Sequence, residues 1–244
     1  MLIDRLRYEW QLMGKKVVLV PLLIMLGFGL FALLLHYMHV DSDRFLSGGL
    51  EMILPLAAGA MVAAVVSYDP AVELQLTMPT HYRRTAIQRM LLILLWSSCV
   101  ALLASSIISA LRLGYTTELI GSTLPSFLQF LIGQLSWCAA LLWCIGFGLC
   151  LALFAHSATA SVAILSGIWM LEIFFKDLVI TISWLKPVIL FPTTLYGLTL
   201  VSHNVYFDWL INRYEVLGTG LLLLLLGYYL LRSTEGLLKG ASEE

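Results

Sequence analysis

The stretch Phe127–Ala155 reads FLQFLIGQLSWCAALLWCIGFGLCLALFA and contains no charged residue. The charge-free region around it extends from Glu118 to Glu172. This region is too long for one crossing of the hydrocarbon core, because about 20 helical residues span its roughly 30 Å. It must therefore fold back on itself, and the polar run His156–Thr159 is the predicted turn. Both arms are expected to be helices, since only an internally hydrogen-bonded backbone is stable in hydrocarbon.

The rest of the chain repeats this pattern of long apolar runs separated by charges. Of its 244 residues, 60% are hydrophobic and 12% are charged, a balance that excludes a soluble domain with one core. Six runs meet or approach the length of a membrane span. They are Val17–Met38, Met52–Tyr68, Met90–Leu111, Phe127–Ala155, Thr159–Ile182 and Val216–Leu231. The sequence predicts an all-α polytopic membrane protein with six transmembrane helices in a single domain, residues 1–244.

Lysine and arginine set the orientation, because short basic loops stay on the cytoplasmic side during insertion. With both termini inside, nine of the 14 lysines and arginines lie in inner segments and five in outer segments. This distribution predicts a multi-pass protein of the cell membrane with both termini cytoplasmic. The polar residues 233–244 would form a cytoplasmic tail.

The first sixteen residues predict an interfacial helix before the first span. On a helix, Leu2, Leu6 and Trp10 share one side, while Asp4 and Tyr8 share the other. Such a helix is expected to lie on the cytoplasmic leaflet with its basic residues near lipid headgroups. The alternative is a solvated start to the first span.

The segment between the second and third runs reads SYDPAVELQLTMPTHYRRTAIQR from Ser67 to Arg89. Asp69 can cap a helix that begins at Pro70, where proline loses no needed donor and has its φ already set. The helix should end near Met78, since Pro79 disfavours helical geometry in the residue before it. The sequence thus predicts a helix of about nine residues, roughly 13 Å long, in the cytoplasm between two membrane helices.

At this segment the chain resembles the type-2 ABC exporter permeases. Members of that family have an interfacial N-terminal helix and six spans with both termini inside. Between spans two and three they have an acidic short helix, a Thr-x-Pro-like break and arginines. The matching residues here are Asp69, Glu73, Leu76, Thr77, Pro79, Arg83 and Arg84. The architecture matches over essentially the whole chain, and the motif over about twenty residues.

The resemblance implies the permease subunit of an ATP-driven exporter, with residues 69–80 as its cytoplasmic coupling helix. The chain has no Gly-x-x-x-x-Gly-Lys-Ser/Thr phosphate loop, so we expect no enzyme activity and no cofactor in it. ATP and Mg²⁺ would be bound by a separate ABC ATPase. Two such ATPase subunits would join this chain and a second copy of it, or a similar permease. The expected ATPase-coupling residues are Asp69, Val72, Glu73, Leu76, Thr77, Met78, Pro79, Arg83 and Arg84.

The segment between the fifth and sixth runs is apolar but interrupted by Pro187 and Pro192. The apolar part is too short to cross the membrane, so we predict a re-entrant outer segment over residues 184–214. The neighbouring spans would have to cover its backbone. An aromatic-rich interfacial loop is the alternative, since Trp184 and Trp209 would suit headgroup level.

Glu172, Lys176 and Asp177 are the only charges inside a predicted run, and Glu172 lies deepest. Charged side chains at membrane depth are functional candidates by default. Lys176 offers Glu172 a partner at i+4. The pair would either face the translocation path or the dimer seam, or neutralise itself near the outer interface.

A secondary transporter or a membrane scaffold without an ATPase is the rival class. A secondary transporter would show internal repeats and broken helices with polar groups at the midplane, and no repeat is visible. The cysteines lie within predicted runs without ligand geometry, so no metal site is expected. The sequence has no basic stripe with interleaved aromatic residues, so nucleic-acid binding is not expected. Membrane lipid is the expected surrounding, and an amphiphilic small molecule or peptide the favoured substrate.

Overall fold

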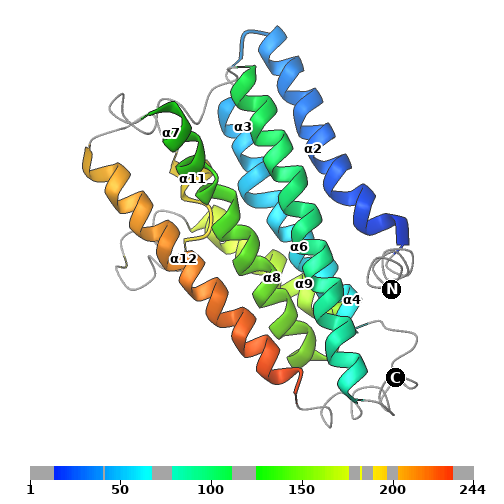
Figure 1. Ribbon diagram of the computed structural model, residues 1–244. Coiled ribbons are helices and arrows are strands. Elements are labelled where there is room, and N and C mark those ends of the chain that lie inside the picture. The colour runs from blue at the N-terminus through cyan, green and yellow to red at the C-terminus, as the bar shows by residue number, and fades with distance from the viewer. Residues whose placement is uncertain are drawn as a thin grey trace.

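The computed structural model of the chain describes residues 14–40, 42–67, 79–111, 125–175, 182, 189–196 and 203–232. Every regular element in this part of the chain is a helix. The long helices lie side by side in one bundle (Figure 1). In chain order the elements are α2 (Gly14–Tyr37), α3 (Asp43–Gly48), the π-helix η1 (Gly49–Ile53), α4 (Leu54–Ser67), α6 (Pro79–Ala110), α7 (Ser126–Gly133), α8 (Leu135–Ala155), α9 (Ala158–Phe174), α11 (Pro192–Tyr196) and α12 (His203–Leu230).

Five helical stretches are long and apolar enough to cross a membrane. They are Gly14–Tyr37, Phe45–Ser67, Arg83–Ala110, Phe127–Ala155 and Phe207–Leu230. Helix α9 is apolar but shorter, at 17 residues. The prediction of an all-α polytopic membrane protein is therefore confirmed at this level. The interfacial helix over residues 1–16 falls largely outside the described residues, which begin with α2 at Gly14, and the tail 233–244 lies outside them too.

Three spans begin at least seven residues before the predicted apolar runs, and the third of the six begins at Arg83 instead of Met90. The second begins at Phe45 instead of Met52, because α3, η1 and α4 follow one another without a break. The last begins at Phe207 instead of Val216, within a helix that starts at His203. Residues 203–214, predicted as part of the outer segment 184–214, are therefore helical and belong to α12.

These longer spans include charged residues that no predicted run contained, and two of those residues have no exposed surface. Glu51 is in η1 and Arg213 is in α12, and both are fully buried. The prediction that Glu172, Lys176 and Asp177 are the only charges within spans was wrong. The error arises because a hydropathy scale penalises each charged residue separately. Two opposite charges that meet inside the bundle attract each other, and this attraction offsets part of their desolvation cost.

Helix α8 lies at the centre of the bundle between α4 and α12 (Figure 1). Glycines bring these helices into backbone contact. A Cβ atom added at Gly148 would meet the Gly59 carbonyl, and one at Gly220 would lie 2.9 Å from the Trp143 backbone nitrogen. Small residues allow this approach, and dispersion at short range is what binds helices in lipid.

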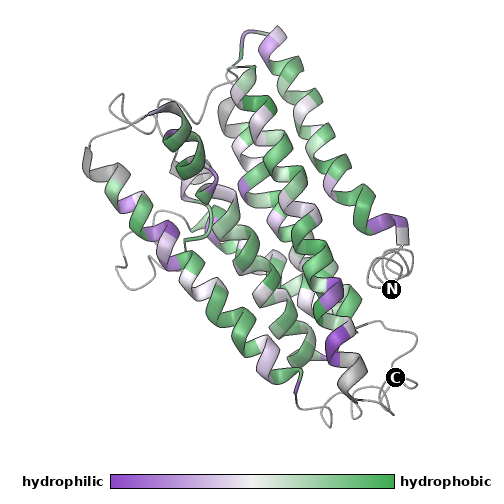
Figure 2. Ribbon diagram, viewed as in Figure 1, coloured by the Kyte–Doolittle hydropathy of each residue, from purple (hydrophilic) through white to green (hydrophobic). Residues whose placement is uncertain are grey.

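The two ends of the bundle differ in charge. The end of α4, the start of α6 and the ends of α8 and α12 lie together (Figure 1), and hydrophilic residues gather there on α6 (Figure 2). Arg83 near the start of α6 places its guanidinium 3.9 Å from the ring centroid of Tyr228 near the end of α12. We call this the basic end, since Arg83, Arg84 and Arg232 lie there.

Candidate functional site

Two charged side chains from different spans meet inside the bundle. Arg213 Nη1 lies 3.3 Å from Glu51 Oε1, and both side chains are 0% exposed. Burying such a pair costs desolvation energy, which the Coulomb attraction offsets only if the remaining donors and acceptors are also satisfied. The partners of the two groups therefore decide whether the arrangement is stable.

Arg213 donates to the backbone of two other segments. Its Nη1 donates to the Ser136 carbonyl on α8 at 3.0 Å. Its Nη2 donates to the carbonyls of Ile189 at 3.1 Å and Leu190 at 3.0 Å, while Nη2 and Nε also donate to Asn212 Oδ1. One guanidinium thus joins α12, α8 and the chain just before α11.

Glu51 accepts hydrogen bonds from the start of α11. Its Oε1 accepts from the Thr193 N–H at 3.3 Å, and its Oε2 accepts from the N–H and the hydroxyl of Thr194, each at 2.7 Å. The Thr193 hydroxyl in turn accepts from Trp209 Nε1 at 3.0 Å. The carboxylate is bound at both oxygens.

Glu172 contacts the same stretch from a third element, α9. Both of its carboxylate oxygens accept from the Leu190 N–H, at 3.2 and 3.1 Å. Its side chain is buried. The predicted i+4 partner Lys176 lies outside the described residues.

These contacts converge on one short piece of chain, residues 189–194. Ile189, Leu190 and Phe191 precede α11 without helical structure, and all three are buried. Non-helical backbone has unpaired N–H and C=O groups, which are costly inside an apolar bundle. The three charged side chains provide partners for the carbonyls of residues 189 and 190 and for the N–H groups of residues 190, 193 and 194. We call Glu51, Glu172 and Arg213 the charged clamp.

The local sequence around Glu51 allows this approach. The π-helical turn of η1 departs from regular α-helix, a feature frequent at functional sites. Gly48 lies against α11, where an added Cβ would make an ordinary van der Waals contact with Thr194 Cγ2 at 3.5 Å. Gly49 leaves room for α2, since a Cβ there would lie 2.7 Å from the Phe28 ring.

The charged clamp lies away from the middle of the spans. Glu51 is six residues into the 23-residue span Phe45–Ser67, and Arg213 six residues into the 24-residue span Phe207–Leu230. At 1.5 Å per residue, each lies about 9 Å from the end opposite the basic end. The arrangement can therefore hold that end of the bundle closed around residues 189–194.

The predicted coupling residues are only partly described. Asp69, Val72, Glu73, Leu76, Thr77 and Met78 lie outside the described residues. Pro79 is the first residue of α6, Arg83 is half-buried against Tyr228, and Arg84 is exposed. The structure joins Glu172, a predicted site residue, to Glu51 and Arg213, which sequence reasoning missed.

One signal in the sequence could have found the missed residues. Glu51 directly precedes a predicted run and Arg213 lies three residues before another, so extending each helix by two turns would have placed opposite charges at similar depth.

No protein-family model, curated protein or solved structure matches this chain.

Proposed function

We propose that this chain is the membrane-spanning permease subunit of an ATP-driven ABC exporter. One observation carries the proposal beyond the sequence resemblance. Glu51 lies on the span that ends at Ser67, directly before the predicted coupling segment, residues 69–80. Arg213 lies on α12, whose far end contacts Arg83, just after that segment. Both partners of the buried ion pair are therefore on helices whose other ends lie at residues that flank the coupling segment in the chain or contact such a residue.

Helices can transmit displacement between these two places. Glu51 is 16 residues from Ser67, about 24 Å along the helix, and Arg213 is 15 residues from Tyr228, about 22 Å. Moving packed helices as rigid bodies is a common switching mechanism. An ATPase that moved α4 relative to α12 at the basic end would separate Glu51 from Arg213, which would release residues 189–194 and open the opposite end.

The proposed topology has six crossings with the basic end in the cytoplasm, in line with the distribution of lysine and arginine. The end of α8 and the start of α12 lie at opposite ends of the bundle (Figure 1), so the chain between them must cross. Helix α9, with 17 residues, covers about 25 Å of that path. Two permease copies would work with two ATPase subunits, which bind ATP and Mg²⁺, to export an amphiphilic small molecule or peptide.

A secondary transporter is the second candidate, and the interrupted segment with charged partners favours it. Such transporters bind substrate and ions at discontinuous helices near the midplane. The charged clamp instead lies about 9 Å from one end of spans about 35 Å long. Its depth suits an end closure better than a midplane binding site, so the exporter remains the first proposal.

The experiment that tests the proposal targets the coupling segment. On the predicted helix, Val72 and Leu76 share a face that would enter an ATPase groove. Leu76→Asp would bury an unpaired charge there, at a cost of a few kcal/mol. The tagged wild-type protein, purified from its native membrane, is expected to bring down a soluble ATPase and to hydrolyse no ATP by itself.

The Leu76→Asp protein should reach the membrane at normal yield but lose both its ATPase and export. The control Glu118→Ala, in a predicted outer loop, should lose neither. Appreciable ATP hydrolysis by the isolated chain would contradict the proposal. Transport that continues without any ATPase and follows an ion gradient would favour the second candidate.

A further inference from the structure

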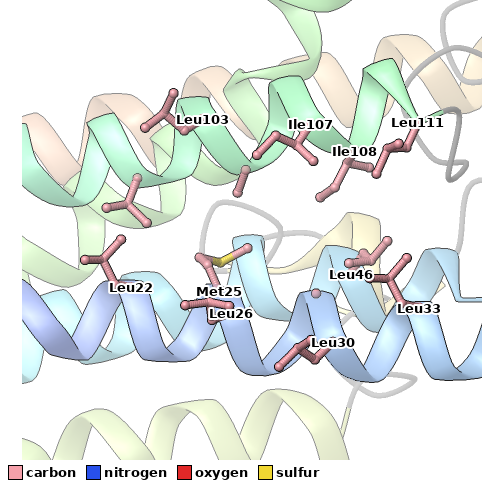
Figure 3. Close-up of a pocket in the computed structure, with 13 residues that line it drawn as sticks. Leu22, Met25, Leu26, Leu30, Leu33, Leu46, Leu103, Ile107, Ile108 and Leu111 are labelled. Atoms are coloured by element: carbon pink, nitrogen blue, oxygen red, sulfur yellow. The ribbon is translucent and has the colours of Figure 1, made fainter.

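An apolar groove runs between α2 and α6, with α3 as its floor (Figure 3). Its volume is about 380 Å³, and each of its thirteen lining residues is apolar. Buried Leu46 forms part of the floor. The rims are open to the surroundings of the bundle, because Leu30 on α2 is 63% exposed and Leu103 on α6 is 60% exposed.

The groove is closed at one end. Trp96 Nε1 on α6 donates a hydrogen bond to the Val18 carbonyl on α2 at 3.2 Å, which joins the two helices. The first lining residues, Leu22 and Val100, each follow one helical turn later. Further along α2, the ring of Phe28 stacks on the ring of Phe45 on α3, with the ring centroids 4.6 Å apart.

The dimensions of the groove match one leaflet of a bilayer. The lining extends from Leu22 to Leu33 on α2 and from Val100 on α6 to Leu111, the residue directly after α6, about 16 Å along each helix. Half of a hydrocarbon core of roughly 30 Å is about 15 Å. The groove therefore begins near the middle of the core and reaches the headgroup level at the end opposite the basic end.

We propose that this groove holds one acyl chain of a resident phospholipid from that leaflet. Water is excluded by walls that offer it no hydrogen-bond partner. A transported substrate would need polar groups that fix its orientation, and the walls have none. A hydrocarbon chain that enters at headgroup level and ends at Trp96 fits both the length and the apolar lining. The proposal does not depend on the exporter function; only the assignment to the outer leaflet rests on the proposed orientation.

Two glycines of α2 provide a matched test. A Cβ atom at Gly29, which lines the groove, would have nothing within 4 Å, so Gly29→Leu has room for its Cβ and adds apolar atoms to the groove. Gly27 is equally open but does not line the groove, so Gly27→Leu is the control. The full-length proteins are reconstituted in phosphatidylcholine with a diazirine near the methyl end of one acyl chain, irradiated, and mapped by peptide mass spectrometry.

We expect labelling of the wild type to concentrate around Leu22 and Val100, several-fold above the exposed surface of α12 at Leu221 and Leu222, which lie at a similar depth to Leu22. A diazirine near the carboxyl end should shift the label toward Leu33 and Leu111. Gly29→Leu should reduce the groove label to the level of α12, and Gly27→Leu should leave it unchanged.

Three results would overturn the proposal. Equal labelling of the groove and α12 in the wild type would mean ordinary surrounding lipid. Disulfide formation between two copies of a Leu103→Cys protein without its native thiols would mean that the groove is an interface between copies. Loss of label when ATP is added to the ATPase-bound complex would mean a transported molecule and not a resident lipid.

Discussion

Replacing Arg213 with methionine should destabilise the protein more than any other single change in the charged clamp. The substitution removes the cation that faces Glu51 and the donors that bind the carbonyls of Ser136, Ile189 and Leu190. Removing one partner of a buried ion pair costs about 3–5 kcal/mol, and each orphaned buried acceptor costs about 1–3 kcal/mol. Taking the lower limit for the pair and for each of the three carbonyls, the loss is at least about 6 kcal/mol, a large part of a typical stability of 5–15 kcal/mol.

The second partner shows whether the charge pair or the packing causes the loss. Glu51→Gln keeps an oxygen that can accept from Thr193 or Thr194 and removes the negative charge. Because Arg213→Met leaves Glu51 as an unpaired buried charge, adding Glu51→Gln should recover part of the lost stability. The double variant should be more stable than Arg213→Met alone, and a double-mutant cycle isolates this coupling.

The assay is the apparent melting temperature of the full-length protein in lipid nanodiscs, taken at one heating rate because membrane-protein unfolding is often irreversible. Arg84→Met is the control, since Arg84 is exposed on α6 and should change the melting temperature little. The reasoning is refuted if the Arg213→Met and Arg84→Met proteins have the same melting temperature. It is also refuted if the fall in melting temperature of the double variant equals the sum of the falls of its two single variants.

Two further predictions follow from topology and packing. Tyr37 and Arg84 are both exposed. In a background without native cysteines, Tyr37→Cys and Arg84→Cys should react with an impermeant thiol reagent from opposite sides of the membrane. Reaction of both from the same side would contradict the predicted topology. Gly148→Ala should lower the melting temperature by the equivalent of about 1–3 kcal/mol, because its Cβ would meet the Gly59 carbonyl. Gly167→Ala, where a Cβ meets nothing within 4 Å, should be neutral or stabilising, since alanine favours helix over glycine by about 1 kcal/mol; equal losses for the two would disprove the close α4–α8 contact.

The sequence predicted the membrane class and most of the spans well. Phe127–Ala155 is the same stretch in the sequence and in the structure, and the turn predicted at His156–Thr159 coincides with the break between α8 and α9. These features depend on the transfer of apolar side chains into hydrocarbon and on local helix signals such as the cap at Ser157, whose hydroxyl accepts from Ala160 N–H at 3.4 Å. Both effects act over a few turns of chain, so they can be read from composition and spacing.

The charged clamp could not be predicted in this way. Glu51 and Arg213 are 162 residues apart, and each by itself appears as a charge that ends an apolar run. Only the packing of η1, α8, α9 and α12 around residues 189–194 shows that each charge has a partner. It also shows that the non-helical backbone of residues 189–194 takes its hydrogen-bond partners from both charged residues. Burial of a charge is favourable or costly according to its neighbours, and those neighbours are fixed by the tertiary structure. The sequence by itself therefore determined that this chain is an all-α membrane protein, while the tertiary structure decided which of its charges lie inside the bundle.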